Sequence, residues 1–137
     1  MISVTSLKRQ HEEISEAIGS IRRFISGGKV EVEAGAHEIA MLVNTLSGKL
    51  KIHLNTEDKY MYPGLLENGA EELKVLAREY MGEMGAISHI FLQYKERFNT
   101  RSKILSAQEN FITESQKVFD LLERRVEREE TSLYIKL

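Results

Sequence analysis

Apolar residues recur at helical spacing in four separate stretches of this 137-residue chain, and this pattern limits the folds open to it. The stretches cover positions 7–25, 39–60, 73–98 and 111–133. Each carries one apolar stripe and is polar elsewhere, as expected for a helix that buries a single face. A single proline and frequent Glu, Lys, Leu and Ile also favour helix. The sequence therefore predicts an all-α protein.

Turn signals between these stretches predict how the helices are connected. The predicted boundaries, in chain order, are Gly27-Gly28 after the first helix, Pro63 as a stop for the second, a middle turn within 64–72 around Asn68-Gly69, Asn99-Thr100 after the third helix, and a Ser106/Glu109 capping box near the start of the fourth. The first and last connections are short, so the helices that they join are antiparallel. We expect an up-down-up-down antiparallel four-helix bundle forming one domain over residues 1–137.

Composition excludes several classes of function. The formal net charge is −2 and no block of like charge occurs, so neither a nucleic-acid site nor a polybasic membrane site is indicated. The chain has no cysteine, which removes disulfides and thiolate chemistry. No signal peptide and no run of about 18 apolar residues is visible. We expect a cytoplasmic protein with neither a nucleic-acid nor a membrane partner.

The second half of the chain repeats the first with two conspicuous exceptions. The segment HLNTEDKYMYP (53–63) aligns with RVEREETSLYI (125–135). The matched pairs are Glu57 with Glu129, Asp58 with Glu130, Met61 with Leu133 and Tyr62 with Tyr134. His53 instead aligns with Arg125, and His11 of the first helix aligns with Met84 of the third. The chain is therefore interpreted as two diverged copies of a helical hairpin.

Polar residues occupy core-facing positions at one level of the predicted bundle. His53 and Glu57 are one turn apart on the second helix, and antiparallel packing brings His11 of the first helix to their height. Arg125 and Glu129 reach the same level from the fourth helix. Burying such groups unpaired costs several kcal/mol each. Imidazole and carboxylate are ordinary ligands of iron, manganese and zinc, so a metal ion is one way to compensate them.

The sequence resembles hemerythrin-like (HHE cation-binding) proteins, whose four-helix bundles hold a pair of metal ions. Their pattern is a His on the first helix, His-x-x-x-Glu on the second, His on the third and His-x-x-x-Glu on the fourth. His11 and the segment from His53 to Glu57 match the first half, and the resemblance extends over essentially the whole chain. Met84 and Arg125 stand where the histidines of the second half belong.

The resemblance and its departures together imply a single metal ion rather than two. The expected ligands are His11, His53, Glu57 and Glu129, with non-haem iron as the first choice and zinc or manganese as alternatives. Arg125 cannot become a ligand, because a guanidinium does not deprotonate. We expect its fork to bind Glu57 and Glu129 and to occupy the charge position of the missing ion.

Three classes of function fit these residues. The leading one is a hemerythrin-like metal-binding protein with a sensing, binding or storage role and a small diatomic ligand as partner; reversible dioxygen carriage is disfavoured because it uses two irons. The second is a metal-free interaction or scaffold module in which an Arg-Glu-His network replaces the ancestral site. The third is an enzyme with a facial iron triad. It is less favoured because the sequence identifies neither a substrate pocket nor a general base outside the metal site.

Other polar residues near these positions are expected to have lesser roles. His89 lies about 140° around its helix from position 84, and His37 about 160° from position 53, so both should face solvent. Glu83 is a candidate partner of Arg125. Met84 is expected to be a core filler. Glu12, Asp58 and Glu130 are expected at the solvated edge, with Glu12 or Asp58 as the alternative partner of an imidazole N–H. Tyr60, Tyr62 and Tyr134 are expected to close one end of the bundle, with a hydroxyl bonded to the site as the alternative.

Overall fold

A computed structural model describes residues 3–137, and these residues are helical almost throughout, with no strand among them. The α-helices are α1 (Val4–Ser26), α2 (Glu33–Thr56), α3 (Tyr62–Asn68), α4 (Glu71–Phe98), α5 (Arg101–Leu105) and α6 (Gln108–Arg128). Short segments of other helix types are Lys29–Glu31, Glu57–Met61, Glu129–Leu133 and Tyr134–Lys136. The predicted all-α fold class is confirmed.

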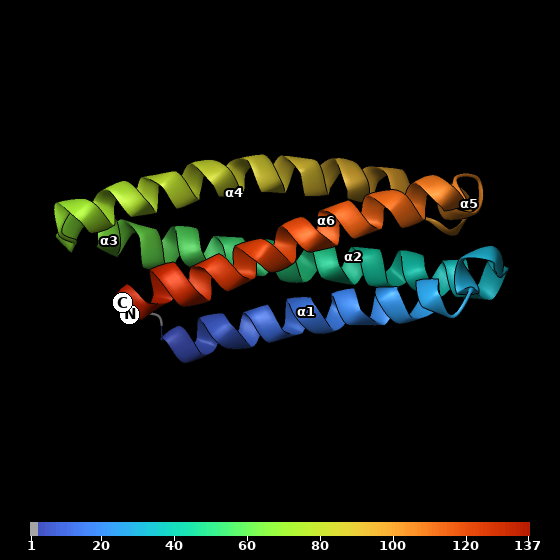
Figure 1. Cartoon of the computed structure of the whole chain (residues 1–137), viewed down its shortest axis with the longest axis horizontal. Coiled ribbons are helices and arrows are strands. Elements are labelled where there is room, and N and C mark those ends of the chain that lie inside the picture. The colour runs from blue at the N-terminus through green and yellow to red at the C-terminus, as the bar shows by residue number, and fades with distance from the viewer. Residues whose placement is uncertain (1–2) are drawn as a thin grey trace.

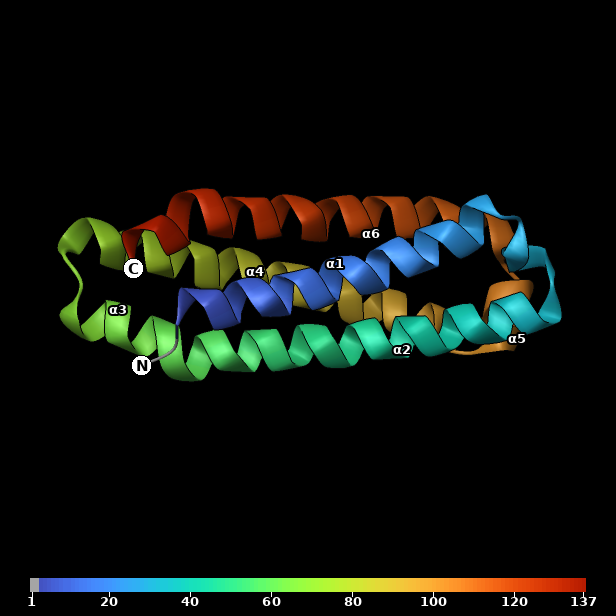
Figure 2. The same ribbon diagram turned by 90° about the horizontal axis from the view of Figure 1, so that it is seen from below.

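The four long helices α1, α2, α4 and α6 lie side by side and alternate in direction (Figures 1 and 2). The start of α1 and the end of the chain lie at the same end of the bundle, which also holds the turn between α3 and α4. The first connection follows the predicted glycine signal: Gly28 has φ 72°, a left-handed conformation that glycine adopts without steric cost. Antiparallel packing therefore places the start of α1 beside the ends of α2 and α6.

The α-helix α2 ends before Pro63 as predicted, but the helical rod continues past that residue. After α2 the chain continues through a five-residue π-helical segment, Glu57–Met61, and then through α3 to Asn68. Pro63 falls in the first turn of α3, where its missing N–H is tolerated and its fixed φ suits the helix. The second long rod of the bundle is therefore longer than the sequence indicated, and the turn follows at Gly69, where it was predicted.

The predicted capping box of the fourth helix is also absent. α6 begins at Gln108 with Ala107 at its N-cap, and no side chain caps it. The Ser106 hydroxyl instead donates to the carbonyl oxygen of Ser102 in the short helix α5, which precedes α6 and which the sequence did not indicate.

The core consists of two apolar clusters separated by a polar layer. The larger cluster fills the bundle towards its α5 end, and the smaller one contains Leu7, Met61, Tyr62, Leu65, Ala77, Tyr80, Leu133 and Tyr134. The buried charged or imidazole groups between them are His11, His53, Glu57, Arg125 and Glu129. Among residues 3–137, no helix combines the length and apolar character that crossing a bilayer requires. The packing of the bundle thus brings the predicted polar residues to one level.

Candidate metal centre

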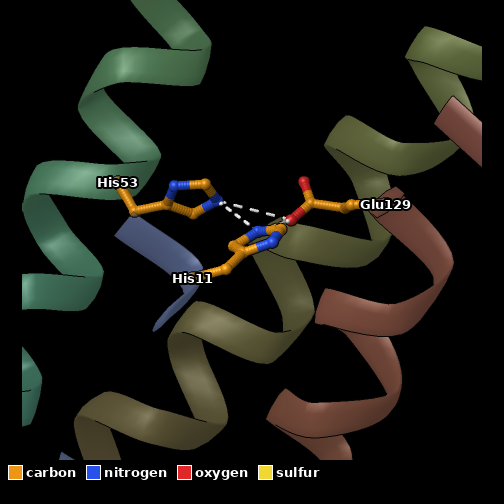
Figure 3. Close-up of side chains that lie close together, drawn as sticks. All are labelled: His11, His53 and Glu129. Atoms are coloured by element: carbon orange, nitrogen blue, oxygen red, sulfur yellow. Dashed lines mark hydrogen bonds and ion pairs between the residues drawn. The ribbon is translucent and has the colours of Figure 1, made fainter. Parts of the chain in front are cut away.

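Three buried side chains from three parts of the bundle converge on one point (Figure 3). They are His11 from α1, His53 from α2 and Glu129, which follows α6. His11 Nε2 lies 3.0 Å from His53 Nε2 and 2.9 Å from Glu129 Oε1. His53 Nε2 lies 3.3 Å from the same carboxylate oxygen. The structure therefore brings together three of the four residues predicted to bind the metal.

Glu57, the fourth predicted ligand, lies next to this point and also contacts His53 Nε2. Its Oε1 lies 3.4 Å from His53 Nε2, and its Oε2 accepts a hydrogen bond of 2.9 Å from the Tyr134 hydroxyl. Glu57 and Glu129 each open a five-residue π-helical segment, so the internal repeat extends to backbone geometry. Such segments are rare and occur frequently at functional sites.

The outer nitrogens of both imidazoles face oxygen acceptors. His11 Nδ1 lies 2.8 Å from Glu130 Oε2, and His53 Nδ1 lies 2.8 Å from Gln10 Oε1. A second contact determines the orientation of the Gln10 amide. Its NH₂ group donates to Thr56 Oγ1 at 3.1 Å, because the Thr56 hydroxyl proton is directed to the carbonyl oxygen of Ile52. In its neutral form, each imidazole therefore carries its proton on Nδ1.

This tautomer leaves the lone pairs of both Nε2 atoms pointing at each other and at an oxygen of Glu129. A proton on one Nε2 satisfies only some of these three atoms, whereas one central cation satisfies all of them. The separations also suit an ion, since donors bound at about 2.1 Å lie about 3.0–3.4 Å apart around a common metal. Metal-binding histidines typically donate their other N–H to a carboxylate, carbonyl or water, as these two rings do to oxygen acceptors.

Unpaired oxygens on the two glutamates strengthen this fit. Within residues 3–137, Glu57 Oε1 and Glu129 Oε2 are buried and accept no hydrogen bond. Buried acceptors normally have a partner, so these two oxygens indicate either a bound cation or a proton shared between the two carboxyl groups. The donor set of imidazole nitrogens and carboxylate oxygens suits iron, zinc or manganese.

The two glutamates differ in their affinity for protons. Burial raises the pKa of Glu57 to about 10, and the adjacent Glu129 carboxylate adds to this shift. Burial alone would raise the pKa of Glu129 as well, but the polar contacts of its carboxylate with Glu57, His11 and His53 lower it. Burial and the two neighbouring carboxylates also raise the pKa of the Tyr134 hydroxyl. Without a metal ion, Glu57 is therefore the protonated member of the pair and Glu129 the ionised one.

Arg125 lies beside the two glutamates but does not bind them in the way predicted. Its Nη2 lies 3.7 Å from Glu129 Oε2, an ion pair rather than a hydrogen bond. The same nitrogen donates to the carbonyl oxygen of Tyr80 at 2.9 Å and to the Tyr62 hydroxyl at 3.2 Å. The expectation of a fork bound to both glutamates is wrong, because Tyr80 and Tyr62 offer better-placed acceptors.

Further contacts hold the guanidinium of Arg125 on the side of the bundle formed by α4. Its Cζ lies 4.4 Å from the centre of the Tyr80 ring, a cation–π distance. Its Nη1 lies 3.4 Å from Glu83 Oε2, as predicted for that glutamate. Glu83 also pairs with the exposed Arg128. The positive charge thus stays near the glutamates while its hydrogen bonds are made elsewhere.

Other predicted residues divide into those near the site and those away from it. His37 and His89 are exposed, as their helical phase indicated. Met84 is buried in the larger apolar cluster, as expected for a core filler. Glu12 and Asp58 are exposed, as expected for the solvated edge, and the imidazole N–H groups contact Glu130 and Gln10.

Three contributors were missed or undervalued by the sequence analysis. Gln10 was not singled out, although its position next to His11 offered a signal. Glu130 was assigned to the solvated edge, but it binds His11. Tyr134 was assigned to closing the bundle, whereas its hydroxyl lies 3.2 Å from His11 Nε2 and 3.4 Å from His53 Nε2.

A small cavity adjoins the converging side chains. Its volume is about 10 Å³, close to the minimum for one water-sized molecule. Its lining residues are Ile14, Leu50, His53, Met84, Leu122, Arg125, Val126 and Glu129. Most of these side chains are apolar, while His53 and Glu129 contribute polar atoms. A small molecule placed there would contact both of these proposed ligands.

Comparison with known proteins supports the reading of this centre. The family model of the hemerythrin HHE cation-binding domain matches residues 3–137. No significant match was found among curated proteins or among solved structures. The matched region spans the entire described chain and includes the cluster of His11, His53 and Glu129 that could hold a metal ion. Sequence, bundle and site agree, and the chain belongs to the hemerythrin HHE cation-binding family.

Proposed function

We propose that this protein binds one non-haem metal ion, iron in the first instance, in the polar layer of the bundle. The proposed ligands are His11, His53, Glu57 and Glu129. The observation that supports this proposal most strongly is the convergence of two Nε2 lone pairs and a carboxylate oxygen within 3.3 Å of one another. The hydrogen bonds on both Nδ1 atoms hold the rings in the tautomer that ligation requires.

The residues of the second half favour a stoichiometry of one metal ion per chain rather than two. Met84 and Arg125 replace the two imidazoles that a second ion would need, and Arg125 brings a permanent positive charge to within 3.7 Å of Glu129. A second cation would have to enter beside that charge without imidazole donors. We therefore infer that Arg125 compensates the glutamates electrostatically in place of a second metal.

The proposed role is to bind or sense a small ligand rather than to carry dioxygen reversibly. Bound iron supplies an open coordination position for such a ligand. The chain contributes the adjoining cavity of about 10 Å³, which is close to the minimum for one water-sized molecule, so a larger ligand could not enter it without movement of the lining side chains. Its apolar walls, including Ile14, Leu50 and Met84, limit the entry of larger or charged molecules.

A metal-free network is the second candidate, favoured by the hydrogen bonds of the second half. Arg125 is already bound to Tyr62 and to the Tyr80 carbonyl, and a protonated Glu57 lowers the charge of the layer. In this case the protein would act as an interaction module. Purified protein would then contain no metal, and a chelator would leave its unfolding free energy unchanged.

Metal analysis of protein purified without an affinity tag separates these two functions. We expect one tightly bound ion per chain and a lower melting temperature after chelation. His53→Ala should abolish binding, whereas His89→Ala, which alters an exposed histidine, should retain the ion. Two tightly bound ions per chain, or an unchanged metal content in His53→Ala, would contradict the proposed site.

A further inference from the structure

The hydroxyl group of Tyr134 lies among the proposed metal ligands. Its oxygen is 2.9 Å from Glu57 Oε2, 3.2 Å from His11 Nε2 and 3.4 Å from His53 Nε2. These are the separations expected between neighbouring donors around one ion with bonds of about 2.1 Å. The hydroxyl carries a single proton, so it cannot donate to all three atoms. Its oxygen therefore takes the place of a fourth convergent donor.

The backbone and the packing both hold Tyr134 in this position. In a regular α-helix a residue five places after Glu129 would lie about 140° away from it. The π-helical segment Glu129–Leu133 closes instead with a hydrogen bond from the Tyr134 N–H to the Glu129 carbonyl, which brings the two residues to the same side. The ring of Tyr134 is buried and stacks on His11, with ring centres 5.3 Å apart and planes inclined by 17°.

The repeat provides a second tyrosine in the equivalent position with a different neighbour. Tyr62 follows Glu57 by five residues through the matching π-helical segment, as Tyr134 follows Glu129. Tyr62 is also buried, but its hydroxyl accepts a hydrogen bond from Arg125 at 3.2 Å. One tyrosine thus faces the two imidazoles and the other faces the guanidinium that replaces an imidazole.

We propose that the Tyr134 oxygen is itself a ligand of the ion held by His11, His53 and Glu129, and that the site therefore prefers ferric iron. This inference rests on the function proposed above. On loading, the phenol O–H bond of Tyr134 and the carboxylic O–H bond of Glu57 break, the oxygens bind the iron and both protons leave to solvent. A phenolate is a hard anionic oxygen donor, and such donors favour the smaller and more highly charged ferric ion over ferrous iron. Tyrosine is an established ligand of iron in other proteins.

Visible spectroscopy of the ferric protein tests this ligand directly. The metal-free full-length chain is loaded with Fe(III) supplied as its citrate complex, and excess iron is removed. We expect a phenolate-to-iron charge-transfer band in the wild type, its loss in Tyr134→Phe, and its retention in Tyr62→Phe. Tyr62→Phe is the matched control, since it removes a buried hydroxyl from the equivalent position of the other half. A band that persists in Tyr134→Phe would overturn the proposal.

Resonance Raman spectroscopy of the wild type makes the test independent of whether Tyr134→Phe folds. Excitation in the visible band should enhance tyrosinate ring vibrations; iron-loaded protein without them has no phenolate ligand, and the inference fails. Iron content separates the two proposals. A colourless protein with one bound iron overturns the Tyr134 ligand alone, while a wild type that binds no iron overturns both the ligand and the proposed function.

Discussion

The two halves of the polar layer occupy repeat-related positions but compensate their buried groups in opposite ways. In the first half, the Nε2 atoms of His11 and His53 converge on one point that could hold a metal cation. In the second half, Arg125 carries a cation on its own side chain, and Tyr62 and the Tyr80 carbonyl accept its hydrogen bonds. Repeat-related positions can thus balance buried polar groups with either a bound metal ion or the guanidinium of an arginine side chain.

Restoring the missing imidazoles should produce the largest change in this comparison. The double variant Met84→His/Arg125→His removes the fixed charge and adds two donors at the positions that match His11 and His53. We expect metal content to rise from one ion per chain to two, as measured by elemental analysis. Met84→His alone keeps the guanidinium and should stay at one ion. A double variant that also holds only one would show that these positions are unsuited to a second metal.

Removing the fixed charge without adding donors should destabilise the bundle. In Arg125→Met the nearby Glu129 carboxylate loses its ion pair, and the Tyr80 carbonyl loses its hydrogen bond. Breaking a buried pair from one side costs about 3 kcal/mol or more. Urea unfolding of chelator-treated protein measures this loss, with the exposed Arg124→Met as a control expected to change by about 0.5 kcal/mol at most. Equal stability of Arg125→Met and wild type would exclude electrostatic compensation by Arg125.

Helical periodicity predicted most of this architecture because it depends on burial, which the order of apolar residues records directly. The same reasoning placed His11, His53 and Glu57 at one level and turned His89 towards solvent. It could not predict the π-helical segments, since one extra residue per turn changes the helical phase without a distinct composition. Tyr134 was undervalued for that reason: counted on an α-helix, it points away from Glu129.

Contacts between helices were the other source of error. Gln10 lies on α1 but holds the imidazole of His53 on α2, and Arg125 on α6 binds a backbone carbonyl of α4. Each partner depends on the distance and rotation between two helices, which a one-dimensional pattern does not contain. Several residues on each helix could have made such contacts, so charge alone led to the wrong partners for Arg125.

The pH dependence of the metal-free protein should reveal the protonated glutamate. Burial raises the pKa of Glu57 to about 10, from 4.5, so the folded protein keeps a proton that the unfolded chain loses above about pH 4.5. Stability should therefore fall as the pH rises from about 5 towards 10, by at most about 1.4 kcal/mol per pH unit. Glu129 does not contribute to this slope. Its pKa is lowered in the folded protein, so the stability that its negative charge provides is already complete above about pH 4.5 and is lost only at lower pH.

Glu57→Gln tests this assignment, since an amide resembles the protonated acid and does not titrate. We expect a flatter dependence of unfolding free energy on pH, measured in chelator at several values between about 6 and 9. Glu12→Gln, which changes an exposed carboxylate, should reproduce the wild-type slope. If Glu57→Gln is as pH-dependent as the wild type, another buried group binds the proton.

The smallest predicted effect concerns the hydrogen bond that orients one imidazole. Gln10→Ala leaves every proposed ligand in place but removes the acceptor of the His53 Nδ1–H, 2.8 Å away. The ring can then move its proton to Nε2, the atom needed for the metal, so the affinity should fall by about tenfold while the metal content at saturation stays at one ion. Competition with a chelator of known affinity measures this shift.

Gln93→Ala is the matched control, because Gln93 contacts the exposed His89 at 3.3 Å and its replacement should leave the metal affinity unchanged. An equal effect of both variants would mean that the first half is not organised for metal binding by its outer hydrogen bonds, and the contrast between the two halves would then rest on Arg125 alone.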